Sequence, residues 1–157
     1  MTLTLGTVPS VLDPPLYIPE LKTRRKEAAL TDLVSLAQQA GAVRGPELLV
    51  DLLMARERLG STAIGKGVAL PHARSFTVSR PLLVVARSRR GIEWDAPDEL
   101  PATLVLLSLT PAEWSEEAHH AFLGRAAAVA RLQRNRQRLQ EALSFDDIAT
   151  VLREVGA

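Results

Sequence analysis

The chain of 157 residues contains no cysteine, which excludes disulfide bonds, thiolate metal sites and cysteine nucleophiles. Aromatic residues make up only 4% of the sequence, so leucine, valine, alanine and isoleucine have to build the core. Neither sign of charge is in excess, because 19 basic residues face 18 acidic ones and the formal net charge is +1. The charges balance, and the basic clusters contain no interleaved aromatic residues. The sequence therefore gives no reason to expect a nucleic-acid partner.

Long hydrophobic runs are also missing. The longest run, around Leu104 to Leu109, is far shorter than the roughly 20 apolar residues with which a helix crosses a bilayer. The first nine residues have neither the basic start nor the apolar centre of a signal peptide. We therefore expect a cytoplasmic protein that does not insert into a membrane.

Hydrophobic periodicity predicts a mixture of helices and strands. Apolar residues at helical spacing predict a helix from Thr23 to Gly41, and a second from Pro46 to Gly60 that buries Leu49, Leu52 and Leu53. Short runs rich in β-forming residues predict strands at 16–18, 68–70, 82–86, 91–94 and 103–109. The last run is nearly all apolar, which indicates a central strand covered on both faces.

The remainder of the chain is predicted to be helical. Thr110-Pro111-Ala112-Glu113 has the spacing of a capping box and predicts the start of a long helix that reaches about Arg134. Two shorter helices are expected at 135–143 and 144–155, the second capped by Ser144 and Asp147. We expect one α/β domain over residues 1–157, with its core at about 8–152 and a small mixed β-sheet between helical layers.

A glycine-rich segment resembles a nucleotide-binding loop at first sight. Gly60-Ser-Thr-Ala-Ile-Gly-Lys66 matches the first seven positions of a P-loop, but the eighth position needs a hydroxyl for Mg²⁺ and holds Gly67. A P-loop also leads into a helix, whose N-terminus faces the phosphates. Because Val68-Ala69-Leu70-Pro71 cannot open a helix well, the sequence argues against nucleotide binding here.

The histidines and one charged helix end are the other candidates for chemistry. His72 follows a short strand and Pro71, a position that suits a functional side chain and equally a surface histidine without a role. His119 and His120 point about 100° apart on a helix, so both cannot serve one site, and the three or four ligands of a zinc site are not in evidence. By spacing alone, Arg56-Glu57-Arg58 is best interpreted as a solvated helix end.

A longer run that contains these residues resembles a known family. The segment is Arg56-Glu-Arg-Leu-Gly-Ser-Thr-Ala-Ile-Gly-Lys-Gly-Val-Ala-Leu-Pro-His-Ala-Arg74. It is similar to the phosphorylation-site segment of the fructose/mannitol-type (type 2) enzyme IIA domains of the bacterial phosphoenolpyruvate-dependent phosphotransferase system. The similarity extends on both sides, from about Val8 to Leu152, and includes Ile92-Glu-Trp-Asp-Ala-Pro-Asp98 and the helix that carries the paired histidines.

The resemblance implies a set of site residues. His72 falls on the phosphorylated histidine and Arg56 on an active-site arginine. Ser61 and Thr62 fall on a pair of hydroxyl residues, and His119, in preference to His120, falls on a second active-site histidine. The resemblance implies neither a metal nor a nucleotide cofactor.

The resemblance also implies a reaction and its partners. A neutral imidazole can attack phosphorus and forms a labile bond, so His72 would accept a phosphoryl group from an HPr-type phosphocarrier protein. It would pass the group to an enzyme IIB in sugar uptake, or its phosphorylation state would regulate other proteins in the nitrogen-related branch. A different class of function stays open, in which the same fold is a protein-binding module that is not phosphorylated.

Overall fold

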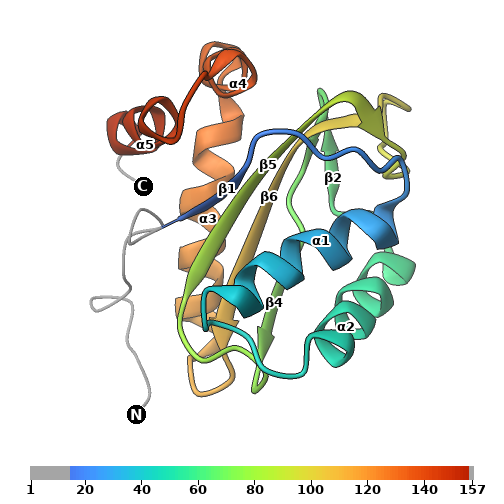
Figure 1. Ribbon diagram of the computed structural model, residues 1–157, viewed down its shortest axis with the longest axis vertical. Helices are drawn as coiled ribbons and strands as arrows, with labels where there is room; N and C mark the ends of the chain where they lie inside the picture. Colours follow the sequence, from blue (N-terminus) through green and yellow to red (C-terminus); the bar gives the residue numbers. More distant parts are fainter. Residues whose placement is uncertain (1–14, 156–157) are drawn as a thin grey trace.

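The two most apolar strands of the chain form the middle of a mixed sheet. In the computed structural model, which describes residues 15–155, β5 (Leu82–Ile92) pairs antiparallel with β6 (Ala102–Pro111) (Figure 1). Four short strands complete the described sheet: β1 (Leu16–Ile18), β2 (Ala63–Gly65), β3 (Val68–Ala69) and β4 (His72–Ser75). The sheet order among the described residues is β1-β5-β6-β3-β2, and β4 also pairs with β6. β1, β3 and β4 run parallel to their neighbours in the centre.

Helices cover both faces of this sheet. α1 (Lys26–Gln39) and α2 (Pro46–Leu59) lie on one face, and α3 (Glu116–Arg131), α4 (Gln133–Glu141) and α5 (Phe145–Glu154) lie on the other (Figure 1). Successive side chains of a strand point to opposite faces, so β6 sends Val105, Leu107 and Leu109 into one core and Leu104 and Leu106 into the other. The structure confirms the predicted α/β class, the mixed sheet between helical layers and the central place of this strand.

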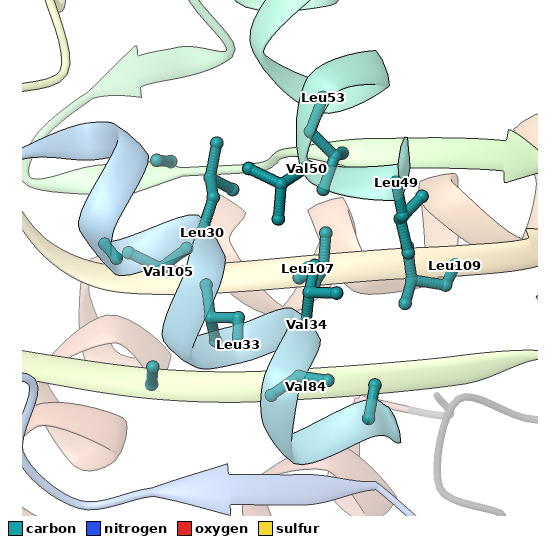
Figure 2. Packing of buried hydrophobic residues seen from close by; sticks show 14 of the residues in the cluster. Leu30, Leu33, Val34, Leu49, Val50, Leu53, Val84, Val105, Leu107 and Leu109 are labelled. Carbon is teal, nitrogen blue, oxygen red and sulfur yellow. The ribbon is translucent and has the colours of Figure 1, made fainter. Parts of the chain in front are cut away.

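The core under the first two helices follows the predicted pattern at α1 but not at α2. Leu30 and Leu33 of α1 are buried as expected, and Figure 2 shows them over the sheet. On α2 the buried stripe follows Leu49, Leu53 and Glu57, spaced four apart, with Val50 beside them. The predicted burial of Leu52 is wrong, because this residue lies off the stripe and is 42% exposed.

The expected strands at 82–86 and 91–94 are a single strand, β5, up to Ile92. The prediction separated them because Arg87-Ser-Arg-Arg90 interrupts the apolar pattern. The structure keeps Arg87 in the sheet, since its guanidinium donates to the carbonyl oxygens of Gln140 and Ala142, each at 2.6 Å, at the end of α4. Arg87, which interrupts the apolar pattern, therefore connects the sheet to the C-terminal helices through hydrogen bonds.

The capping box predicted at Thr110 is also wrong. β6 continues to Pro111, and α3 begins only at Glu116, where the Ser115 side chain accepts a hydrogen bond from the Ala118 amide at 3.0 Å. Thr110 does not cap, because its hydroxyl is buried against a histidine of α3. In contrast, the predicted cap at Ser144 is confirmed, since its side chain accepts from the Asp147 amide at 3.3 Å.

The five described helices are short. None of them is long and apolar enough to span a bilayer.

Candidate active site

The glycine-rich segment forms a β-hairpin. β2 and β3 pair antiparallel around Gly65-Lys66-Gly67, and the Asp98 carboxylate accepts a hydrogen bond from the Lys66 amide at 2.7 Å. Gly67 has φ +79°, and a Cβ there would lie 2.9 Å from the Thr103 hydroxyl, so the tight turn requires glycine. Because a strand and not a helix follows, the structure confirms that this loop lacks the geometry of a P-loop.

His72 opens the strand that follows this hairpin. β3 and β4 both run parallel to β6, with Leu70 and Pro71 between them. His72 pairs in register with Ser108 of β6 and its ring lies near a residue of α3. Its Nδ1 lies 3.1 Å from the carbonyl oxygen of Leu70. A carbonyl only accepts hydrogen bonds, so this contact favours a proton on Nδ1 and leaves the lone pair on Nε2.

The structure places His119 beside His72. His119 lies in the first turns of α3 and is only 5% exposed, and its ring centroid is 5.6 Å from that of His72. Its Nδ1 is 2.7 Å from the Thr110 hydroxyl oxygen. His120 is exposed on the same helix. Of the two neighbours, one is thus buried and the other exposed, and their ring centroids lie 5.7 Å apart.

The environment of His119 favours its neutral form. The pKa of His119 is lowered to about 4, mainly by burial and to a smaller extent by electrostatic repulsion from His72, His120 and Arg74. The Arg74 guanidinium is held nearby by a hydrogen bond of 2.7 Å to the Trp114 carbonyl, in the connection between β6 and α3. At neutral pH the second histidine of the site is therefore an uncharged donor or acceptor.

This pKa predicts a pH dependence of stability. Between about pH 6.5 and pH 4, the unfolded chain binds a proton at His119 that the folded protein does not, so the free energy of unfolding falls as the pH is lowered. The expected loss attributable to His119 is about 2–3 kcal/mol between pH 7 and pH 4.5. Urea titrations of the wild-type protein and of His119→Gln at both pH values measure it. Equal losses in both proteins would contradict the prediction.

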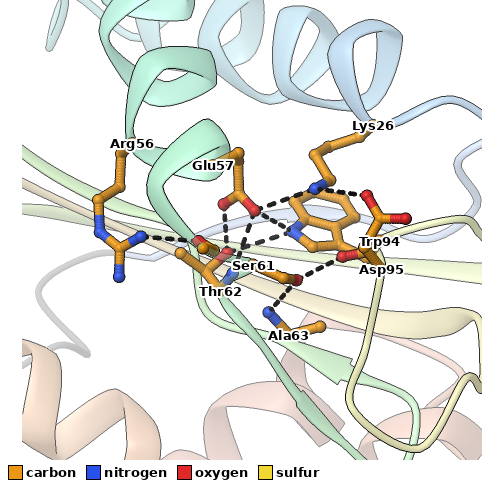
Figure 3. Close-up of polar contacts among 9 residues, drawn as sticks. Lys26, Arg56, Glu57, Ser61, Thr62, Ala63, Trp94 and Asp95 are labelled. Carbon is orange, nitrogen blue, oxygen red and sulfur yellow. Dashed lines mark hydrogen bonds and ion pairs between the residues drawn. The ribbon is translucent and has the colours of Figure 1, made fainter.

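A buried carboxylate organises the loop before His72. Glu57 accepts hydrogen bonds from the Thr62 amide and the Trp94 Nε1, each at 3.1 Å, and from the Thr62 hydroxyl. Lys26 Nζ lies 3.2 Å from the same carboxylate (Figure 3). The Glu57 side chain is only 3% exposed. The interpretation of Arg56-Glu57-Arg58 as a solvated helix end is therefore wrong for its central residue.

The other site residues predicted from the sequence lie in the same loop or next to it. The Arg56 guanidinium donates to the Gly60 carbonyl at 2.7 Å, and the Ser61 hydroxyl donates to the carbonyl of Trp94 (Figure 3). The Thr62 carbonyl accepts from the Leu70 amide at 3.0 Å. The Leu70 carbonyl in turn contacts Nδ1 of His72. A series of hydrogen bonds therefore connects Glu57, through Thr62 and Leu70, to the histidine.

The predicted site residues thus form two connected groups. His72 and His119 face each other between β4 and α3, while Arg56, Ser61 and Thr62 hold the loop at the end of α2. Among residues 15–155, no group of three or more histidine, aspartate or glutamate residues could hold a metal ion.

Sequence reasoning missed four polar residues of this region. They are Glu57, Trp94, Thr110 and Arg74. The alternating charges around Glu57 are typical of a solvated helix end, and Thr110 had the spacing of a helix cap. Trp94 and Arg74 lay inside the resembling segments but carried no signal of a role.

Comparisons with known proteins show which family the chain belongs to. Residues 10–155 match the family described as "Phosphoenolpyruvate-dependent sugar phosphotransferase system, EIIA 2". The chain is 37% identical over 130 residues to the PTS system fructose-specific EIIA component of Haloferax volcanii, covering 83% of this chain and 84% of that protein. It is 30% identical over 145 residues to a nitrogen regulatory protein of Bradyrhizobium diazoefficiens, covering 92% and 94% of the two chains.

A solved structure shows the same fold. Enzyme IIAMTL of Escherichia coli, determined in complex with phosphorylated enzyme IIBMTL, superposes with a TM-score of 0.77 at 20% identity, over 91% of this chain and 97% of that chain. The family match over residues 10–155 and the 37% identity to the Haloferax protein show that this protein belongs to the type 2 EIIA family of the phosphoenolpyruvate-dependent phosphotransferase system.

Proposed function

We propose that His72 accepts a phosphoryl group on Nε2 from the phosphohistidine of an HPr-type carrier protein. The observation that carries this proposal is the contact of 3.1 Å between His72 Nδ1 and the Leu70 carbonyl. It holds the proton on Nδ1 and leaves a lone pair on Nε2, which is the form of histidine that attacks phosphorus. The family relationship supports phosphotransferase activity but does not identify the residue.

The proposed step is a direct transfer between two imidazole rings. The lone pair of His72 Nε2 forms the new N–P bond while the N–P bond to the carrier's histidine breaks and its electrons return to that ring. Such a transfer depends on in-line positioning and on stabilisation of charge on the phosphoryl oxygens. No metal or nucleotide takes part in the proposed step.

Two further residues, His119 and Arg56, are proposed to assist this transfer. His119, neutral and 5.6 Å from His72 between ring centroids, provides a hydrogen-bonding nitrogen. Arg56 has a guanidinium with five N–H donors, and the only one engaged in a hydrogen bond among the described residues binds Gly60. Its forked geometry suits phosphoryl oxygens.

The hydroxyls of Ser61 and Thr62 are assigned a positioning role in this proposal. Both donate to groups of the protein, Ser61 to Trp94 and Thr62 to Glu57. A hydroxyl has one proton to donate, so neither is left to donate to a phosphoryl group in this arrangement. They instead hold the loop whose Thr62 carbonyl binds the Leu70 amide next to His72.

The proposed acceptor is an enzyme IIB. The complex of the E. coli relative with phosphorylated enzyme IIBMTL supports this proposal. The relatives include both a fructose-specific component and a nitrogen regulatory protein, so the phosphorylation state of His72 can also serve regulation. We further propose that residues 1–157 act as one cytoplasmic domain.

The test is phosphorylation of the wild-type protein. After incubation with phosphoenolpyruvate, enzyme I and an HPr-type carrier, the protein is expected to gain one phosphoryl group. The bond should be labile in acid and stable in alkali, as expected for phosphohistidine, and adding a cognate enzyme IIB should remove the label. If the carrier is phosphorylated but this protein stays unlabelled, the proposal fails, and an unphosphorylated binding module becomes the better interpretation.

A further inference from the structure

A buried threonine contacts the second histidine of the site. Thr110 is fully buried on β6, and its hydroxyl oxygen lies 2.7 Å from Nδ1 of His119. Thr110 pairs in register with Arg74, and Ser108, two residues earlier on the same strand, pairs with His72. The threonine therefore lies on the strand next to that of His72, at the level where α3 packs against the sheet.

The direction of this hydrogen bond follows from the partners of the two groups. Within residues 15–155, the contact with His119 is the only hydrogen bond of the Thr110 hydroxyl. If His119 carried its proton on Nδ1, the hydroxyl proton would be buried without an acceptor, at a cost of about 1–3 kcal/mol. If the hydroxyl donates to Nδ1, both groups are satisfied, and the proton of the neutral ring lies on Nε2.

The tautomer decides what His119 offers to a phosphoryl group. A protonated Nε2 donates a hydrogen bond to an anionic oxygen, whereas an unprotonated Nε2 presents a lone pair that repels it. Because His119 is neutral at pH 7, its ring carries a single proton. The nitrogen that holds this proton is the one that can donate a hydrogen bond. Burial of the ring, and repulsion from His72, His120 and Arg74, oppose a second proton.

We propose that Thr110 is a positioning residue that donates to Nδ1 of His119 and so keeps the donor proton on Nε2, facing the phosphoryl group at His72. Its importance for transfer rests on the proposed function. The tautomer itself is a property of the free protein and does not depend on that function.

The first test reads the tautomer in the absence of any partner. Long-range ¹H–¹⁵N NMR correlations of the wild-type protein at pH 7 are expected to show His119 protonated on Nε2 and unprotonated on Nδ1. Finding the proton on Nδ1 would overturn the proposal. Phosphoryl transfer is not needed for this result, so it stands apart from a failure of the proposed function.

The second test compares three variants. Thr110→Val keeps the shape but removes the hydroxyl, and it should lose the Nε2–H preference and slow phosphoryl uptake about tenfold, the effect of one hydrogen bond. Thr110→Ser should restore both properties to within about twofold. Ser108→Ala is the matched control, because this neighbouring buried hydroxyl has no hydrogen-bond partner within the described residues, and its removal should leave the His119 tautomer unchanged.

The outcomes separate positioning from packing. If Thr110→Ser behaves like Thr110→Val, the methyl group and not the hydroxyl matters, and the proposal is wrong. It is equally wrong if Thr110→Val keeps the wild-type tautomer and rate. If wild-type protein shows the Nε2–H tautomer but takes up no phosphoryl group, the proposed function fails while the hydrogen-bond assignment stands.

Discussion

Replacing His72 with alanine is expected to abolish phosphoryl uptake, with a loss of at least about a thousandfold in rate, because the variant lacks the nucleophile. The other nitrogens nearby do not substitute for it. His119 is buried and directs Nδ1 to Thr110, and the Arg74 guanidinium is a cation without a lone pair to donate. Labelling from phosphoenolpyruvate through enzyme I and a carrier protein measures the loss.

A control variant separates a specific effect from a general one. His120→Ala removes an exposed histidine beside the site and should leave the rate of labelling within about threefold of the wild-type rate. His72 is half-buried at the start of β4, so the His72→Ala variant should keep its fold, which circular dichroism would verify. A folded His72→Ala protein that is labelled as fast as the wild-type protein would remove His72 from the reaction.

Replacing Glu57 with glutamine is expected to have the largest effect on stability. Within residues 15–155, its carboxylate accepts from four groups, namely the Thr62 amide and hydroxyl, the Trp94 indole and the Lys26 ammonium group. A carboxylate accepts from all of them, whereas glutamine has a single acceptor oxygen. Its NH₂ group can face only the Thr62 hydroxyl, whose proton then loses the carboxylate oxygen as its acceptor, and Lys26 loses its negatively charged partner. The expected loss in the free energy of unfolding is about 2–4 kcal/mol, measured by urea titration.

The same substitution should also slow phosphoryl uptake. Glu57 holds Thr62, and the Thr62 carbonyl binds the amide of Leu70 beside His72, so a displaced loop shifts the nucleophile. Glu27→Gln is the matched control, because it makes the same change at an exposed position of α1 and should cost less than about 0.5 kcal/mol. Equal stabilities of the two variants would show that the buried network does not stabilise the fold.

The parts of the fold that were predictable depend on local patterns. The apolar stripe of α1 and the continuous apolar run of β6 each reflect how one element buries its own side chains, and both predictions are confirmed. The start of α3 was mispredicted for a related reason. Thr110 satisfies the local rule for a helix cap, but burial against His119 keeps it in the strand, and no local pattern contains that contact.

In the candidate site too, features that depend on local sequence were predictable and contacts between distant residues were not. The segment around His72 was identified by its resemblance to a family, and the preference for His119 over His120 came from the same resemblance. In the structure His119 is buried and His120 is exposed. The burial of Glu57 was not predictable from spacing, because its partners Trp94 and Lys26 lie 37 and 31 residues away and come together only through the fold. Charged residues that alternate at a helix end are consistent with either solvent or a buried network until those partners are placed.

The most direct measurement is to locate the phosphoryl group in the phosphorylated protein. Combined ³¹P and ¹⁵N NMR of protein labelled with ¹⁵N-histidine is expected to show one phosphorus atom bonded to Nε2 of His72, with Nδ1 of the same ring protonated and held by the Leu70 carbonyl. A phosphoryl group on His119, on His120 or on Nδ1 of His72 would contradict the assignment of His72 Nε2 as the phosphoryl acceptor.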